Sequence, residues 1–373
     1  MDKANSTKAN RVFGIDLARG TAALMLASVH TVWIYAAADA QETSVGIAVH
    51  TIGQATCAFL ITMGFSFIIT KHQSINYALK RAFLIFIAGY ILNTFKFIIP
   101  IVTFGTMPES FIKAYGWHYP LNNDQLLYLF LTGDILQMAG ISFAIAGLIR
   151  KFIKNKYLIL ILALCAIGLY TQVKGYRPGI TGIDYLCDLL WGSQWNVYFP
   201  VFPWISNILI GMFMGMIYQS SKETSGEGGL YKGTLILGPA SLIVGAALCY
   251  YDWEYHFNNF FHSGPGGMLL AVGTSLCFFY FYAKILTKPL QNKAWFRNAM
   301  LYLSSRVTSI YFIQWTIICW GMGIFGYQTL GLDKLLILMP TMTCLTLVVD
   351  YVLLKATQNI KLSNNYHQAE IRS

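Results

Sequence analysis

Three ionisable side chains lie in the first long apolar segment of the chain. Asp16, Arg19 and His30 all fall within residues 14–37. On a helix, Asp16 and Arg19 lie about 60° apart, and Arg19 and His30 only about 20° apart. The three side chains therefore share one stripe, with His30 about 16 Å further along the axis than Arg19. Ionisable groups in such a segment indicate a functional site, although a structural Asp16–Arg19 ion pair and a hydrogen-bonded core histidine are the alternatives.

Further polar side chains are expected at the depth of His30. His50 and Gln54 lie one turn apart near the start of the second apolar segment, and Asp134 and Gln137 lie near the outer end of the fourth. We expect these side chains to meet His30 in one outward-opening cavity. Because a carboxylate can hold an imidazole in the tautomer of a general base, the hypothesis is that Asp134 orients His30. His50 is either a second candidate base or a structural hydrogen-bonding residue.

Other polar residues give weaker signals. Arg306 opens the ninth apolar segment, where its side chain could extend to the membrane surface, and Gln314 lies near the middle of that segment. His256 and His262 flank an outer loop, and we expect them to be solvated. Aromatic residues in the outer loops favour either an interfacial belt or a surface on which a sugar ring stacks.

The elements that must position these residues are membrane-spanning helices. Only 11% of the 373 residues are charged and 56% are apolar, whereas roughly a quarter of a soluble domain is charged. Each spanning helix needs about 20 mostly apolar residues. Ten segments meet this requirement: 14–37, 45–70, 82–101, 127–149, 157–172, 198–218, 233–251, 265–286, 305–326 and 333–354. The expected fold class is an all-α integral membrane protein, a single bundle of about ten transmembrane helices in the lipid bilayer.

The charges of the connecting segments orient this bundle. Lys and Arg concentrate in both tails and in alternate loops, and the intervening loops carry acids and little base. The positive-inside rule then places both termini in the cytoplasm. We expect a multi-pass protein of the cell membrane, with a cytoplasmic tail over 1–13, a membrane domain over 14–354 and a second cytoplasmic tail over 355–373.

Two classes of partner are not expected from the composition. The basic residues lie between apolar segments instead of clustering on one solvated face, and this distribution argues against a nucleic-acid partner. The seven cysteines are an odd number and show no CxxC or Cys/His ligand spacing, so we expect no structural metal. A homo-oligomer is left open.

Several motifs carry a resemblance to a known family. The segment Arg11-Val-Phe-Gly-Ile-Asp16-Leu-Ala-Arg19-Gly20, followed by His30, resembles the opening of the transmembrane acyltransferases. These include the acyltransferase-3 group and the heparan-alpha-glucosaminide N-acetyltransferase-like group. Four later segments resemble motifs of the second group: Met63-Gly64-Phe65-Ser66, Gly133-Asp134-Ile135-Leu136-Gln137, Phe199-Pro200-Val201-Phe202-Pro203-Trp204 with Gly211 and Gly215, and Ser309-Ile310-Tyr311-Phe312-Ile313-Gln314.

The resemblance implies transfer of an acetyl group from cytoplasmic acetyl-CoA to a carbohydrate hydroxyl or amine on the opposite side of the membrane. His30 matches the position that acts on the acyl group, and Arg19 matches an arginine placed towards the donor. The catalytic candidates are His30, Asp134 and His50. Because arginine binds phosphate through two parallel hydrogen bonds, the candidates for donor binding are Arg19, Arg11, Lys80, Arg81 and Arg306. The candidates for acceptor binding are Asp16, Gln54, Gln137, Gln314 and Trp204.

Two departures from the family pattern leave the acceptor open. Gln314 stands where many relatives have histidine, and the first outer loop, 39–44, has no histidine where the heparan-type enzyme has one. N-acetylation and O-acetylation therefore both remain possible. The alternative function is a multi-pass transporter in which Asp16, Arg19 and His30 relay protons or gate a solute. Inverted repeats are the usual mark of such transporters, and we detect none in the sequence.

Overall fold

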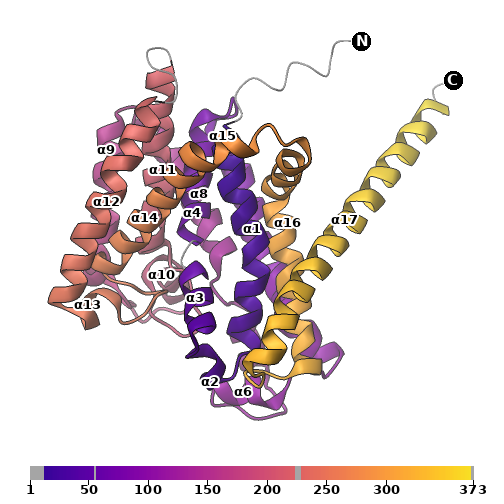
Figure 1. Ribbon diagram of the computed structural model, residues 1–373. Coiled ribbons are helices and arrows are strands. Elements are labelled where there is room, and N and C mark those ends of the chain that lie inside the picture. The colour runs from indigo at the N-terminus through magenta and orange to yellow at the C-terminus, as the bar shows by residue number, and fades with distance from the viewer. Residues whose placement is uncertain (1–11, 54–55, 223–227, 371–373) are drawn as a thin grey trace. The chain divides into compact units, whose positions relative to one another are not determined.

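The computed structural model describes residues 12–53, 56–222 and 228–370. Within these ranges the chain forms helices and no strand, apart from two isolated β-bridges. Ten helical stretches are long and apolar enough to cross a membrane (Figure 1). The predicted all-α membrane fold and its ten spans are therefore confirmed.

Most spanning stretches are single α-helices: α1 (Phe13–Tyr35), α8 (Ile135–Phe152), α9 (Lys156–Val173), α11 (Val201–Lys222), α12 (Gly228–Tyr251), α16 (Ala294–Phe325) and α17 (Leu332–Glu370). The others combine several elements: α3 (Ser44–Gly53) with α4 (Thr56–Ile69), α5 (Ile75–Asn93) with the π-helix η1 (Thr94–Thr103), and α14 (Pro265–Tyr280) with the π-helix η2 (Phe281–Leu286) and α15 (Thr287–Leu290). The connecting segments contain five short helices: α2 (Ala38–Gln41), α6 (Glu109–Ala114), α7 (Asn123–Phe130), α10 (Ile183–Trp191) and α13 (Trp253–Phe257).

The expected boundaries are wrong for several spans. The third was expected to begin at 82, but α5 begins at Ile75, and the tenth was expected to end at 354, but α17 continues to Glu370. The fourth was expected over 127–149, but α7 ends at Phe130 and a new helix, α8, begins at Ile135. Asp134 accounts for this break, because its side chain caps the first turn of α8 in a capping box with Gln137. The ninth was expected to begin at 305, but α16 already begins at Ala294.

The chain divides into two compact units. Unit 1 comprises residues 1–22, 54–98 and 121–304, and unit 2 comprises 23–53, 99–120 and 305–373. The division falls inside three helices, namely α1, η1 and α16. Each unit is described by itself below.

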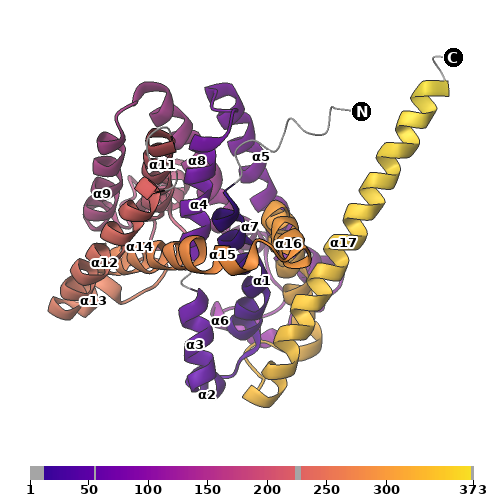
Figure 2. The ribbon, with the colours of Figure 1, turned by 45° about the horizontal axis from the view of Figure 1, so that its top comes forward.

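In unit 1, two spanning helices pack backbone to backbone. A Cβ atom added to Gly64 of α4 would lie 1.9 Å from the carbonyl oxygen of Ile208, and one added to Gly211 of α11 would lie 2.0 Å from that of Ile61. Only glycine permits such an approach, as in other membrane helix pairs with small residues at the crossing. The glycines of two family-like motifs therefore form one helix contact. The neighbouring pairs α5–α8 and α12–α14 pack along their lengths (Figure 2).

In unit 2, the end of α1 is tied to both C-terminal helices. The Tyr35 hydroxyl donates to the carbonyl of Ile318 in α16 at 2.6 Å. Ala36 and Leu330 form an isolated bridge, and the amide of Leu330 donates to the carbonyl of Tyr35 at 2.8 Å. The C-terminal end of α1 and the N-terminal end of α17 therefore lie at the same end of unit 2.

Candidate active site

His30 lies in an aromatic cluster within unit 2. Its ring is buried, with 5% of its surface exposed, and it stacks on Trp315 of α16 with ring centroids 4.1 Å apart. Trp33 of α1 and Tyr311 of α16 complete the cluster at centroid distances of 5.4 and 6.0 Å. Flat contact with an indole restrains the plane of the imidazole ring.

His50 borders the same cluster from α3. Its ring centroid lies 6.2 Å from that of Trp33, so Trp33 contacts both histidines. The His50 Nδ1 atom lies 3.0 Å from the carbonyl oxygen of Gly46. A carbonyl oxygen only accepts hydrogen bonds, so Nδ1 carries a proton, and in the neutral ring Nε2 then has the free lone pair. The expected structural hydrogen bond of His50 is present, and it leaves an acceptor nitrogen on the ring.

Gln314 adds a buried amide on the same helix face as two members of the cluster. It follows Tyr311 by three residues and precedes Trp315, a spacing that places the three side chains on one side of α16. Gln314 is completely buried. Within the described ranges, neither its Oε1 nor its Nε2 has a hydrogen-bond partner. Because a buried amide without partners is costly, Gln314 can offer both a donor and an acceptor to a ligand or a water molecule.

A second polar centre, in unit 1, surrounds Asp134. The Asp134 carboxylate accepts a hydrogen bond from Lys96 Nζ at 2.8 Å and another from the backbone amide of Ile135 at 2.7 Å. Lys96 and Asp134 expose only 2% and 4% of their surfaces, so this is a buried ion pair. Lys96 comes from η1, and π-helical turns often occur at functional sites.

Three buried polar side chains accompany this ion pair. Asn93 donates through Nδ2 to the carbonyls of Phe130 and Thr132, both at 2.8 Å. The described residues provide no hydrogen-bond partner for Asn93 Oδ1, Thr132 Oγ1 or Gln137 Nε2. Gln137, predicted to bind substrate, packs its amide against Gly89. The centre can therefore hydrogen-bond a polar group, in addition to holding its own charges.

The predicted contact between His30 and Asp134 stays a prediction, because the two residues belong to different units. What the structure adds is that Lys96, which the sequence analysis missed, balances the charge of Asp134.

The N-terminal turns of α1 hold the other two members of the predicted stripe. Asp16 is buried and accepts a hydrogen bond from Ser304 Oγ at 2.6 Å. Arg19 is half-buried one turn later. Because α1 is unbroken from Phe13 to Tyr35, the helical spacing between Arg19 and His30 is as predicted.

The remaining basic candidates differ in their surroundings. Lys80 and Arg81 are exposed near the start of α5, and the Arg81 guanidinium lies 5.6 Å from the centroid of the Phe143 ring. Arg306 instead forms a bidentate ion pair with the buried carboxylate of Asp350, with distances of 2.7 and 3.0 Å. This pair gives Arg306 a structural role, and its predicted role at the donor stays a prediction. Arg11 and Gln54 lie outside the described residues.

A family model decides the relationship of the chain to known proteins. The model of the catalytic region of heparan-alpha-glucosaminide N-acetyltransferase matches residues 11–251. The chain belongs to this family. The protein is accordingly a member of a family of membrane acetyltransferases, and the described part of its chain contains ten apolar helical stretches of spanning length. No curated protein matches the chain. The family match includes His30, His50 and the Lys96–Asp134 pair, whereas Gln314 lies beyond it.

Two predictions, one about the segment around α13 and one about α11, are affected. His256 and His262 were expected to be solvated, which is wrong, because both are buried. His262 Nε2 donates to the carbonyl of Val197 at 2.7 Å, and burial lowers the pKa of the imidazole to about 4. Trp204 is fully buried and donates its indole N–H to the carbonyl of Phe261 at 2.8 Å. Packing thus accounts for Trp204, and a role in substrate binding stays a prediction.

Sequence reasoning also missed the aromatic residues around His30. A signal existed, since Tyr311 and Trp315 are four apart and flank Gln314, which places an aromatic pair beside the one buried amide of that helix face. Lys96 also had a signal, as a single charged residue inside a predicted span. No group of three His, Cys, Asp or Glu side chains that could hold a metal ion occurs among residues 12–53, 56–222 and 228–370.

Proposed function

We propose that this acetyltransferase moves the acetyl group of cytoplasmic acetyl-CoA to an amine or hydroxyl of a carbohydrate on the opposite face of the cell membrane. The observation that carries the proposal is His30, a buried imidazole stacked on Trp315 and located eleven residues after Arg19 on the same unbroken helix. This spacing separates a cationic position from an imidazole by about 16 Å along the helix.

The chemistry requires a proton acceptor. When the nitrogen or oxygen of the acceptor attacks the thioester carbonyl, a C–N or C–O bond forms, the C–S bond breaks and coenzyme A leaves as its thiolate. The attacking atom must also lose its proton. A neutral imidazole, with an ordinary pKa of about 6.5, is suited to take that proton. A positioned general base typically contributes roughly 10²–10⁴-fold to the rate. In our proposal His30 is this base, and Trp315 holds its ring in position.

A second route uses the same ring as a nucleophile. A ring nitrogen of His30 attacks the thioester, a C–N bond forms as the C–S bond breaks, and coenzyme A leaves as its thiolate. The acceptor then attacks the acetyl-imidazole, the C–N bond breaks, and the imidazole takes the acceptor's proton. The two routes differ in one observable property. Only the second produces an acetylated enzyme when the donor is present and the acceptor is absent.

In our proposal, basic side chains bind the phosphate groups of acetyl-CoA. Arg19 is half-buried in α1, and Lys80 and Arg81 are exposed at the start of α5, so the three can reach phosphate groups from an aqueous side. Arginine suits phosphate through its planar fork. We expect Arg19→Ala to raise the KM for acetyl-CoA, and unchanged KM and kcat in that variant would remove Arg19 from the donor site.

The decisive experiment uses inside-out membrane vesicles loaded with methyl α-D-glucosaminide, which offers both an amine and hydroxyls. Acetyl-CoA labelled in the acetyl group is added outside, and the labelled sugar is measured inside. We expect transfer by the wild type, and a loss of at least 100-fold for His30→Phe, which keeps an aromatic ring beside Trp315 and removes the nitrogen atoms.

The matched control is His72→Ala, because His72 is an exposed histidine in the loop before α5. It should transfer at the wild-type rate. A His30→Phe protein that melts at the wild-type temperature and still transfers at the wild-type rate would exclude both routes through His30, and would leave His50 as the candidate base.

A further inference from the structure

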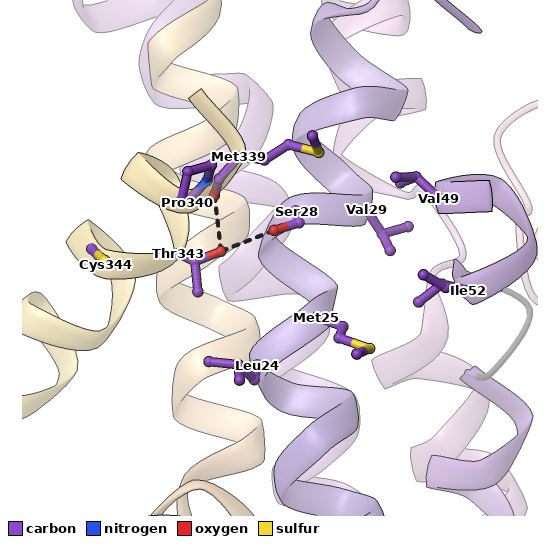
Figure 3. A pocket seen from close by; sticks show the side chains of 10 residues that line it. All are labelled: Leu24, Met25, Ser28, Val29, Val49, Ile52, Met339, Pro340, Thr343 and Cys344. Atoms are coloured by element: carbon purple, nitrogen blue, oxygen red, sulfur yellow. Dashed lines mark hydrogen bonds between the residues drawn. The ribbon is translucent and has the colours of Figure 1, made fainter. Parts of the chain in front are cut away.

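A lateral groove in unit 2 lies among α1, α3 and α17 (Figure 3). Its volume is about 420 Å³, which is within the range of ligand pockets. The lining side chains come from positions between Leu24 and Val29 of α1, from Val49 and Ile52 of α3, and from positions between Met339 and Cys344 of α17. Every one of these positions belongs to a helix that is apolar enough to span a membrane.

The polar atoms on the groove wall are already hydrogen-bonded to protein. Ser28 and Thr343 share a hydrogen bond of 3.1 Å, and the Thr343 hydroxyl donates to the carbonyl of Met339 at 2.9 Å, as Figure 3 shows. The rest of the lining is made of aliphatic side chains, sulfur atoms and a proline ring. Such a wall suits a hydrocarbon chain and offers little to a sugar or a phosphate.

The groove lies in one half of the spanning helices, and its named lining positions are about 9–16 Å from the helix ends. Val29 and Leu24 lie six and eleven residues before the end of α1 at Tyr35, which is about 9 and 16 Å along the axis. Met339 and Thr343 lie seven and eleven residues after the start of α17, which is about 10 and 16 Å. These two helix ends are joined by the bridge between Ala36 and Leu330. One leaflet of the hydrocarbon core is about 15 Å thick.

The shallow end of the groove borders the histidine cluster through Trp33. Val29 and Trp33 are four residues apart on α1 and share one helix face, and the Trp33 ring centroid lies 5.4 Å from that of His30 and 6.2 Å from that of His50. The two walls also touch there. A Cβ atom added to Gly53 of α3 would lie 2.9 Å from the Trp33 ring and 3.0 Å from Val29. A chain lying in the groove therefore ends beside Trp33, the ring that contacts both histidines.

We infer that the groove binds the hydrocarbon chain of a glycolipid acceptor, whose sugar then lies at His30 and His50. This inference rests on the proposed function, and it specifies the acceptor as an amphiphile anchored in the leaflet. A chain fixed in the groove holds the sugar at the histidines, which raises its local concentration and restricts its orientation.

The first arm of the test compares two acceptors that differ only in their chain, methyl and decyl α-D-glucosaminide. With the wild type in nanodiscs of phosphatidylethanolamine and phosphatidylglycerol, the decyl compound should have a KM at least tenfold below that of the methyl compound. Cys344→Trp fills the groove from its rim and should reduce this ratio to about twofold or less. The control, Ile337→Trp, places the same ring on an exposed position of α17 outside the groove and should keep the wild-type ratio.

The second arm measures binding without activity. A decyl glucosaminide with a diazirine in its chain is photo-crosslinked, and the labelled peptides are mapped. We expect labelling in the segments 24–29 and 339–344, at least fivefold weaker in Cys344→Trp. Equal labelling of these segments by a diazirine phosphatidylethanolamine would mean that the groove holds ordinary bilayer lipid, and it would overturn the inference.

The two arms separate the possible failures. Transfer to both acceptors with equal KM would refute the groove as an acceptor site and leave the proposed function intact. Absence of transfer to either acceptor would contradict the proposed function, and the labelling would then decide by itself whether the groove binds the glycolipid chain.

Discussion

Replacing Gly211 by alanine should weaken the crossing of α4 and α11. The added Cβ would lie 2.0 Å from the carbonyl oxygen of Ile61, whereas real Cβ contacts are essentially never closer than 3.0 Å. The two backbones must therefore separate by at least the difference, 1.0 Å. A gap of that size forfeits up to about half of the dispersion energy of each contact at the crossing.

The size of the effect follows from two opposing terms. Overpacking of this kind costs about 1–3 kcal/mol, and alanine is better than glycine in a helix by up to about 1 kcal/mol. We expect Gly211→Ala to lower the free energy of unfolding by about 1–2 kcal/mol. Gly64→Ala should behave in the same way, since its Cβ would lie 1.9 Å from the carbonyl oxygen of Ile208.

The assay is equilibrium unfolding in mixed micelles, supported by thermal melting. The control is Gly168→Ala, because Gly168 lies inside α9 and an added Cβ there would meet no atom within 4 Å; it should be neutral or slightly stabilising. The double variant of Gly64 and Gly211 should lose less free energy of unfolding than the two single variants lose together, because one separation of the helices relieves both clashes. Wild-type stability in Gly211→Ala, or strict additivity in the double variant, would refute the close crossing.

Three further predictions concern charge and topology. Asp134→Asn keeps a capping residue but leaves Lys96 charged and buried, so this variant should lose about 3–5 kcal/mol of stability. Adding Lys96→Met should restore a large part of that loss in the same unfolding assay. Burial lowers the pKa of His262 from 6.5 to about 4, so between these pH values the unfolded chain takes up a proton that the folded chain does not. Stability should therefore fall as the pH drops through this window, by up to about 3 kcal/mol, and acid titration of His262→Gln should lack this component. In a variant without native cysteines, external labelling should reach single cysteines placed at 110 and 180 but not at 75 and 290; the reverse pattern would contradict cytoplasmic termini.

The number of spans and the stripe on α1 could be predicted because both are local properties. Hydropathy over about 20 residues identifies a span, and the helical period alone fixes the spacing of Arg19 and His30. The partner of Asp134 could not be predicted in this way. Lys96 lies 38 residues earlier, and the pair forms only because α5 packs along α8.

Other misses have the same physical origin. The burial of His262 depends on its hydrogen bond to Val197, 65 residues away, and a polar loop sequence contains no signal for that contact. The stacking of His30 on Trp315 likewise joins helices from opposite ends of the chain. The helix break at Thr132-Gly133-Asp134 could have been predicted from the sequence, because an Asp followed three residues later by Gln is a signal for the start of a helix.

The π-helix η1 affects whether the third span can tolerate the deletion of a residue. Residues 94–103 complete each wide turn with one residue more than an α-helix uses. Deletion of a single residue there would return one wide turn to the α-helical pitch, while every position beyond the deletion would rotate by about 100°. This span can therefore lose one residue without breaking its helix, and the side chains that follow, from the deletion to Thr103, would then face new directions.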